Sequence, residues 1–316
     1  MKHTLFVTSN RLGDAVLTTG ALYHLLKTEP DVPITVVCGH LSADIYTAIP
    51  GVEKVIAISK RKRSLHWWDA FKQLKFRFWH RVVDYRGSPL SILPARHRHI
   101  WRGSSSEVHK AIANARVIGV DHPLPPKIVP QNKNPDALSH LQQSDRILAI
   151  APTANAEKKQ WHHENYLALA KALTKDGGIL EGAFVAVLGA PGEEAQALPV
   201  VEGLPENQVI NLVGKTTPLQ VAEILSRCKL FVGNDSGLMH TAVAVGIPTV
   251  GLFGVGQPAV YGPWGRKSLC LIGDPPGEKI TRHIDQDAEG NEKTRETLPP
   301  DLVIHKVEEF YRKLES

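Results

Sequence analysis

Cysteine is scarce in this sequence of 316 residues, where Cys38, Cys228 and Cys270 stand far apart. They form neither a CxxC pair nor a Cys/His spacing typical of zinc ligands, so the sequence predicts reduced thiols, no disulfide framework and no metal site. No other cluster of candidate metal ligands stands out in the sequence.

Long apolar runs are also missing. The apolar stretch 4–8 is too short for a secretory signal, and Arg11 and Asp14 follow it at once. One long uncharged stretch, 236–265, is interrupted throughout by Gly and Pro, which is not typical of a membrane span. We therefore expect a soluble, cytoplasmic protein.

Composition is that of a globular protein, with 42% apolar and 22% charged residues. The formal net charge is +5, and basic residues gather at 60–63, 77–81 and 96–102. These clusters fit a solvated basic face, or a surface that meets the phosphates of an anionic lipid or a nucleic acid. Aromatic residues at 67–79 interleave with them, which favours contact with a membrane surface, although some should belong to the core. Nucleic-acid binding would rest on charge alone, and we do not predict it.

The stretch 231–254 organises the chain. An apolar run over 228–232 predicts a buried strand, and Gly233 to Asp235 break it. Asp235 is a candidate cap for a helix that begins at Ser236 and ends near Gly246. A second strand is expected over 249–253. Strand, helix and strand in this order indicate a parallel sheet. The backbone N–H groups at the start of the helix are unpaired, so an anion is favoured there.

Strands and helices alternate in the same way from the N-terminus. Strands are expected over 4–8, 34–38, 52–58 and 81–84, and helices over 14–27 and 65–78; this alternation predicts a doubly wound sheet. Five prolines between Asp121 and Asp145 suggest a boundary, after which the alternation restarts. We predict domains at 1–140 and 141–316, and a last amphipathic helix at about 301–314.

Two nucleotide-binding signatures are absent. After the first strand the sequence reads SNRLGDAV, where a dinucleotide-binding domain would carry G-x-G-x-x-G, and there is no P-loop. Two α/β halves without either signature suggest a nucleotide-sugar enzyme of GT-B type. We therefore predict an α/β fold with two Rossmann-like doubly wound domains facing across a cleft.

Four blocks carry a likeness to a known family. They are NRLGDAVLTTGAL at 10–22, KKQWHHENY at 158–166, VLGAPGEE at 187–194 and VGNDSGLMHTAVAVGIPTVGLFG at 232–254, with VDYRGS at 83–88 and LPPDLVIHKVEEF at 298–310 in support. In these blocks the chain resembles glycosyltransferase family 9, the ADP-heptose:lipopolysaccharide heptosyltransferases. The resemblance implies an N-terminal acceptor domain, a C-terminal donor domain, and a last helix, at about 301–314, that packs back toward the first domain. It also implies inverting transfer of heptose without a covalent sugar intermediate.

The chain departs from the family in two places. After Gly265 only Cys270 remains of a cysteine-rich pattern that many members show, and the first part of the loop TANAEKKQW matches poorly. These departures leave the donor sugar and the acceptor open. The alternatives are a GT-B enzyme that uses another nucleotide sugar and a non-catalytic nucleotide-binding scaffold.

Asp14 is the candidate catalytic base. An inverting transfer needs a group that takes the proton of the acceptor hydroxyl, and Asp14 follows Gly13 at the start of a helix, where the dipole favours a carboxylate. The resemblance places the catalytic aspartate here; the plain alternative is a first-turn aspartate. Gly13 and Arg11 are the candidate acceptor-binding residues, Arg11 toward a phosphate or carboxylate.

The candidate donor-binding residues follow from the resemblance. They are Lys159 for the diphosphate, Thr153 as a further phosphate contact, Glu193 for the ribose, and Asp235, Ser236, Gly237 and His240 of the donor motif. Lys158 is the alternative to Lys159. A lysine and a helix N-terminus can do the work of a metal ion, so no cofactor is required, though a weak dependence on Mg²⁺ stays open.

The function predicted from these residues is transfer of heptose from ADP-heptose to a lipopolysaccharide core or a related glycan. Its partners would be the nucleotide sugar and an anionic glycan or glycolipid. The basic, aromatic surface of the first domain would contact the inner face of the membrane.

Overall fold

The computed structural model describes residues 2–59, 61, 64–74, 77–103, 107–132, 135–156, 159–254, 256–273 and 298–316. Lys158, most of the basic cluster at 60–63 and residues 274–297 lie outside the described residues. The chain divides into two compact units, which we call the N-unit (Met1–Gln131 with Thr217–Leu219) and the C-unit (Asn132–Thr216 with Gln220–Ser316).

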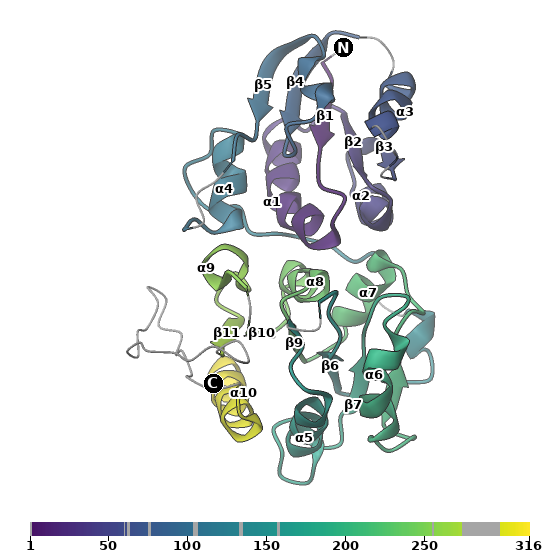
Figure 1. Ribbon diagram of the computed structural model, residues 1–316, viewed down its shortest axis with the longest axis vertical. Helices are drawn as coiled ribbons and strands as arrows, with labels where there is room; N and C mark the ends of the chain where they lie inside the picture. Colours follow the sequence, from purple (N-terminus) through teal and green to yellow (C-terminus); the bar gives the residue numbers. More distant parts are fainter. Residues whose placement is uncertain are drawn as a thin grey trace. The chain divides into compact units, whose positions relative to one another are not determined.

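The described part of the N-unit forms a parallel sheet of five strands, in the order β3-β2-β1-β4-β5 (Figure 1). Its strands are β1 (Thr4–Val7), β2 (Ile34–Gly39), β3 (Val52–Ile58), β4 (Trp79–Asp84) and β5 (Ala95–Ile100). Its helices are α1 (Leu12–Thr28), α2 (Ala43–Thr47), α3 (Leu65–Gln73) and α4 (Lys110–Val117).

Both faces of this sheet are covered, and β1 shows how. Its side chains alternate, so Phe6 joins one apolar cluster with residues of α1 and α4, while Leu5 and Val7 join another with Ala70 of α3. All four residues of β1 are buried. A central parallel strand buried on both sides is expected to be continuously apolar, as this one nearly is.

The C-unit contains a parallel sheet of six strands in its described part, in the order β11-β10-β9-β6-β7-β8. Its strands are β6 (Ile147–Ala151), β7 (Phe184–Val187), β8 (Val209–Asn211), β9 (Leu230–Asn234), β10 (Thr249–Phe253) and β11 (Ser268–Ile272). Its helices are α5 (His163–Thr174), α6 (Glu194–Glu202), α7 (Pro218–Leu225), α8 (Gly237–Val245), α9 (Pro258–Tyr261) and α10 (Pro300–Glu315).

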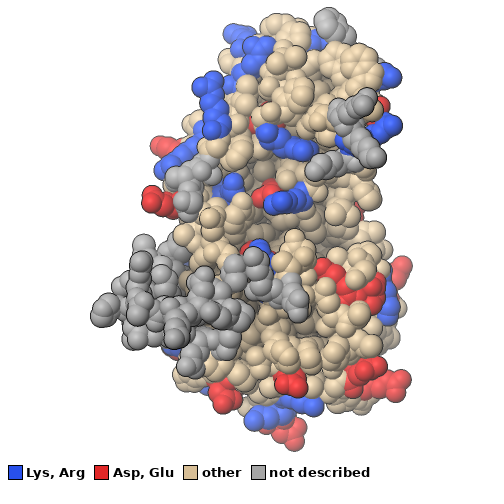
Figure 2. Space-filling view, viewed as in Figure 1, with Lys and Arg blue, Asp and Glu red and all other residues tan. Residues whose placement is uncertain are grey.

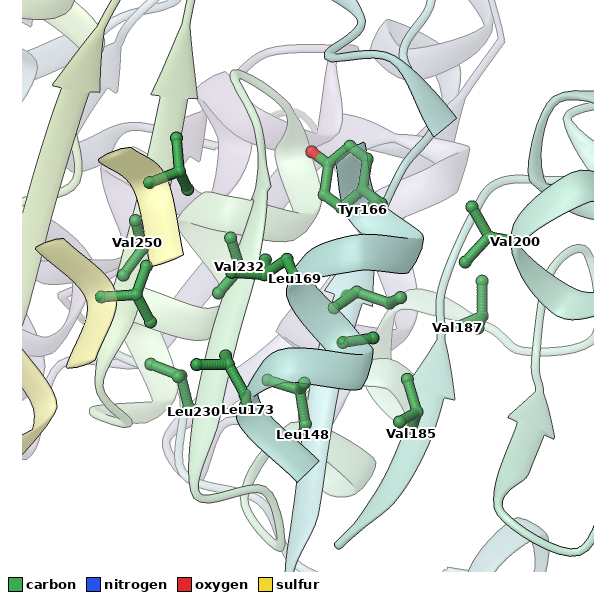
Figure 3. Packing of buried hydrophobic residues seen from close by; sticks show 14 of the residues in the cluster. Leu148, Tyr166, Leu169, Leu173, Val185, Val187, Val200, Leu230, Val232 and Val250 are labelled. Atoms are coloured by element: carbon green, nitrogen blue, oxygen red, sulfur yellow. The ribbon is translucent and has the colours of Figure 1, made fainter. Parts of the chain in front are cut away.

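The larger apolar cluster of the C-unit lies between α5 and one face of the sheet. Tyr166, Leu169 and Leu173 point from this helix toward strand residues such as Leu148 and Val232 (Figure 3). Helix α10 contributes its own buried residues to the same cluster. The opposite face of the sheet is covered by α7 and α8, which share a second cluster with the alternate residues of β6.

Several elements differ from the sequence-based expectation. Strand β5 was not expected because Arg and His alternate along it; it is an edge strand, where exposed charges are common. The predicted helix over 65–78 ends at Gln73, and β4 begins at Trp79. Strand β11 and helices α4 and α6 were also not expected, α6 because Pro199 lies within it.

Candidate functional site

Each unit has one point where the strand order reverses. In the N-unit it lies between β1 and β4, and in the C-unit between β6 and β9. In open parallel sheets ligands bind beyond the carboxyl ends of the two strands at such a point. The predicted acceptor residues follow β1, and the predicted donor residues include those that follow β6 and β9.

Asn234, the last residue of β9, joins the two loops of the C-unit site. Its buried side-chain oxygen accepts a hydrogen bond from the backbone N–H of Trp161 at 3.0 Å. Its side-chain amide donates toward the backbone carbonyls of Pro152 and Thr153 at 3.1 and 3.3 Å. The loop after β6 is thereby fixed to the end of β9. Asn234 was not among the predicted site residues, although a polar residue at the end of an apolar strand is a signal that the sequence contains.

Lys159 and Asp235 form an ion pair across this junction. The Lys159 ammonium lies 2.5 Å from a carboxylate oxygen of Asp235, and the side chains are 30% and 12% exposed. Lys159 comes from the loop that Asn234 holds, and Asp235 directly follows Asn234. The pair holds the Lys159 ammonium beside Asp235, the residue that precedes the N-cap of α8.

Helix α8 begins beside this pair. Its N-cap is Ser236, and Asp235 does not cap it, because the Asp235 carboxylate bonds Lys159. The Ser236 hydroxyl oxygen is buried and has no hydrogen-bond partner among the described residues, so this side chain does not cap the first turn, which starts at Gly237. Unpaired N–H groups, a free hydroxyl and a nearby ammonium together suit a phosphate.

His240 lies one turn further along α8. Its side chain is 4% exposed, and its ring centre lies 6.5 Å from that of Tyr261. It therefore belongs to the packed side of the start of α8.

Thr153 and Glu193 bond to each other. The Thr153 hydroxyl donates to the Glu193 carboxylate at 2.5 Å, and the Ala190 N–H donates to the same oxygen at 2.9 Å. Thr153 is buried, whereas Glu193 is half-buried at the start of α6. The bond places this acid beside the loop after β6, and its other carboxylate oxygen accepts no hydrogen bond from the described residues.

In the N-unit, Asp14 lies in the first turn of α1 and is half-buried. Arg11 is the N-cap; its side chain is exposed, and its backbone N–H donates to the Ser9 hydroxyl at 3.1 Å. No side chain caps this helix, and Gly13 sits within its first turn. Asp14 thus has a carboxylate available at a helix start, as a base requires.

A second group at this point was missed by the sequence analysis. Asp84, the last residue of β4, is fully buried and accepts hydrogen bonds from the N–H groups of Arg86 and Ser88 and from the Ser88 hydroxyl. Burial raises the pKa of Asp84 above its ordinary value, and these hydrogen bonds oppose the rise. The turn they hold presents Arg86, whose guanidinium donates to the Asn10 side-chain oxygen at 2.8 Å.

Among the described residues, the only group of three His, Cys, Asp or Glu side chains close enough to share a metal ion is His162, His163 and Glu164. These are consecutive residues at the start of α5, and none of the predicted site residues belongs to the group. The described helices include none that is both long enough and apolar enough to cross a bilayer.

The sequence model of glycosyltransferase family 9 (heptosyltransferase) matches residues 80–290. The chain belongs to glycosyltransferase family 9. The predicted family is therefore confirmed, and the match includes every predicted donor-binding residue. Asp14, Gly13 and Arg11 precede the matched range.

Curated relatives of this family-9 chain are heptosyltransferases. It is 30% identical over 171 residues to lipooligosaccharide heptosyltransferase 2 of Haemophilus influenzae, covering 53% of this chain and 48% of the relative. It is 24% identical over 336 residues to lipopolysaccharide heptosyltransferase 3 of Escherichia coli, covering 94% and 96%. In the alignments with the Haemophilus relatives the chain spans about half of the relative's length.

Solved structures of the same family share the fold. ADP-heptose lipopolysaccharide heptosyltransferase II of E. coli has a TM-score of 0.73 at 21% identity over the whole of both chains. The family-9 glycosyltransferase of Veillonella parvula has a TM-score of 0.78 at 22% identity, covering 100% of this chain and 98% of that one. The predicted α/β fold of GT-B type, with two doubly wound Rossmann-like units, is confirmed.

Proposed function

We propose that the protein is an inverting glycosyltransferase that transfers heptose from ADP-heptose to a lipopolysaccharide core or a related anionic glycan. The observation that carries the proposal is the C-unit junction, where Lys159, the start of α8 and the free Ser236 hydroxyl offer donors to a diphosphate. Membership of family 9 and the names of the relatives supply the sugar.

In this proposal the Asp14 carboxylate takes the proton of the acceptor hydroxyl as that oxygen attacks the anomeric carbon. The bond from the anomeric carbon to the diphosphate breaks, and ADP leaves with the electron pair. Lys159 and the N–H groups at the start of α8 stabilise the negative charge that develops on the leaving diphosphate. Direct attack on one face of the sugar inverts its configuration, and no metal ion is required for these steps.

The test of the base is Asp14→Asn, with Asp31→Asn as the matched control because Asp31 is an exposed aspartate of the same unit. Removal of a general base should lower kcat about 10²- to 10⁴-fold, with ADP affinity unchanged by calorimetry. Unchanged turnover in Asp14→Asn would remove this carboxylate from the mechanism, and loss of activity in Asp31→Asn would show that the effect is not specific.

The donor is tested by mixing the protein with a deacylated core acceptor and ADP-heptose, a UDP-sugar or a GDP-sugar in turn. Release of ADP from ADP-heptose alone supports the proposal. Turnover of another nucleotide sugar indicates the alternative donor, and nucleotide binding without turnover of any donor indicates a scaffold.

The proposal includes contact of the N-unit with an anionic membrane surface. Leu65, Trp68 and Phe71 recur at every third position of α3 and are 48%, 57% and 38% exposed. The Trp68 and Phe71 rings stack at 5.8 Å, and the Lys72 ammonium lies 5.7 Å from the Trp68 ring. Lys and Arg side chains are spread over the face of the N-unit seen in Figure 2. Exposed aromatic residues beside cations suit the headgroup region of an anionic bilayer.

This contact is tested by sedimentation with vesicles of phosphatidylglycerol and phosphatidylethanolamine. The double variant Trp68→Ser, Phe71→Ser should lose binding, whereas Leu198→Ser, which replaces a 48% exposed leucine of the C-unit, should not. Equal binding of the double variant would exclude α3 as the contact.

A further inference from the structure

Arg86 lies at the point of the N-unit sheet where the strand order reverses. It follows β4 by two residues, and its guanidinium bonds the side chain of Asn10 in the loop after β1. That loop leads into α1, which carries Asp14 in its first turn. A guanidinium is therefore held between the two strand ends beyond which a ligand of this sheet would bind.

The charge of Arg86 has no ion-pair partner in the described part of the chain. The side chain is half-buried, and burial lowers the pKa of the guanidinium, opposed by the nearby Asp84 carboxylate. The oxygens of Asp84, however, accept from backbone N–H groups and the Ser88 hydroxyl rather than from the guanidinium. Arg81, by contrast, makes two hydrogen bonds to the Glu29 carboxylate at 2.8 and 3.0 Å.

The position of the guanidinium is fixed from two sides. Its central carbon lies 4.7 Å from the centre of the Trp67 ring, and one terminal N–H group bonds the Asn10 oxygen. Asn10 is itself fixed, because the backbone at Gly39 approaches so closely that a Cβ there would lie 2.5 Å from the Asn10 Cα. A guanidinium carries five N–H donors in one plane, so most of its donors are left for a ligand.

We propose that Arg86 is an acceptor-binding residue, which holds a phosphate or carboxylate group of the acceptor glycan beside Asp14. A planar guanidinium binds either oxyanion through two parallel hydrogen bonds, and this fixes orientation as well as position. The inference rests on the proposed function for its acceptor, but the oxyanion site itself can be tested without any transfer reaction.

The binding test uses the full chain labelled with ¹⁵N and follows the indole N–H of Trp67, which touches the guanidinium. Glucose 6-phosphate, glucuronate and glucose serve as probes for phosphate, carboxylate and neutral sugar. We expect the signal to shift with one or both anions but not with glucose, and to stop shifting in Arg86→Gln. A response to neither anion, or an equal response in Arg86→Gln, would overturn the proposal.

Arg96→Gln is the matched control, because Arg96 is exposed on the edge strand β5. It should respond like the parent protein. Arg86→Lys keeps the charge but loses the planar fork, and should respond with weaker affinity. ADP affinity should be the same in all variants. A lower ADP affinity in Arg86→Gln would show that this substitution disturbs the fold. The response of Arg86→Lys to the anions would then decide whether Arg86 binds an oxyanion.

The kinetic test separates this proposal from the proposed function. With an acceptor that carries the oxyanion, Arg86→Gln should raise the acceptor KM about 10-fold or more, while the donor KM stays unchanged. An unchanged acceptor KM would overturn the role of Arg86 while leaving the transferase standing. Absence of transfer by the parent protein, with anion-dependent shifts retained, would overturn the proposed function and leave the oxyanion site standing.

Discussion

The Lys159 ammonium lies 2.5 Å from the Asp235 carboxylate. The pair joins the loop after β6 to the residue that precedes the N-cap of α8. Both side chains come from segments held by Asn234. The pair keeps the lysine extended toward the start of α8, where a diphosphate would bind. The lysine is thus positioned before any ligand arrives, which reduces the entropy lost on binding.

Lys159→Gln should weaken ADP binding roughly 10- to 100-fold, the range expected for the loss of a charge-assisted hydrogen bond. Asp235→Asn should weaken it less, because the lysine stays present but is no longer held. Calorimetric titration with ADP measures both. Lys171→Gln, at an exposed position of α5, is the control. Equal affinity in Lys159→Gln would show that another group meets the phosphates.

Asn234→Asp should destabilise the protein increasingly as pH rises. Its carboxylate would be buried and would face the carbonyls of Pro152 and Thr153, so the folded protein should raise the pKa of this group above its unfolded value. A raised folded pKa means that stability is retained below the unfolded value of about 4 and lost above it.

Urea unfolding of Asn234→Asp and of the parent at pH 5 and pH 8 measures this effect. The difference in the free energy of unfolding should be larger at pH 8. Asn234→Ala should instead cost about 1–3 kcal/mol at either pH, because the buried Trp161 N–H loses its acceptor. A constant difference for Asn234→Asp would contradict the burial of this side chain.

Gly20→Ala should destabilise the N-unit although alanine is the better helix former. Alanine gains about 1 kcal/mol over glycine within a helix. A Cβ at Gly20 would, however, lie 2.2 Å from the carbonyl oxygen of Pro125 and 2.5 Å from that of Leu124. Overpacking against backbone costs about 1–3 kcal/mol, so the net change is a lower Tm. A Tm equal to that of the parent would show that segment 124–125 moves aside freely.

The native thiols should be unreactive toward Ellman's reagent. All three cysteines are buried, and burial raises the pKa of Cys38 and Cys228 from 9.0 to about 12. At pH 8 only about 10⁻⁴ of each of these two thiols would be thiolate, the reactive form. We expect no rapid reaction in the native protein and three equivalents after denaturation; a fast native equivalent would contradict the burial.

The same pKa shifts predict lower stability at alkaline pH. The folded protein holds these thiol protons more tightly than the unfolded chain, so the free energy of unfolding should fall as pH rises from 9 toward 12. Guanidinium unfolding at pH 8 and pH 10 measures the fall. In a variant with Cys38→Ala and Cys228→Ala, the free energy of unfolding should fall less between these pH values. A fall equal to that of the parent would assign the effect to other groups, such as the buried tyrosines.

The buried strands were predictable from the sequence because their apolar runs are continuous. The stretches 34–38 and 249–253 match β2 and β10 closely, since a strand covered on both faces has no polar alternation to obscure it. Edge strand β5 escaped prediction for the opposite reason: its exposed Arg and His residues resemble a solvated loop.

The site was predictable in part. The identities of Lys159 and Asp235 follow from the family likeness, but their ion pair depends on two loops 76 positions apart in the sequence, which no local pattern reveals. Asn234 and Arg86 were missed because the contacts that mark them are long-range, to the loop after β6 and to Asn10.

Each unit contains its own apolar clusters on both faces of its sheet, and its own reversal of strand order. Neither sheet borrows a strand from the other. Chimaeras that exchange only the loops after β1 and β4 with those of a homologue should therefore fold, and should acquire that homologue's acceptor preference while nucleotide recognition is inherited unchanged. Under the proposed function, a change of acceptor within such a lineage would then need few substitutions, confined to one half of the polypeptide.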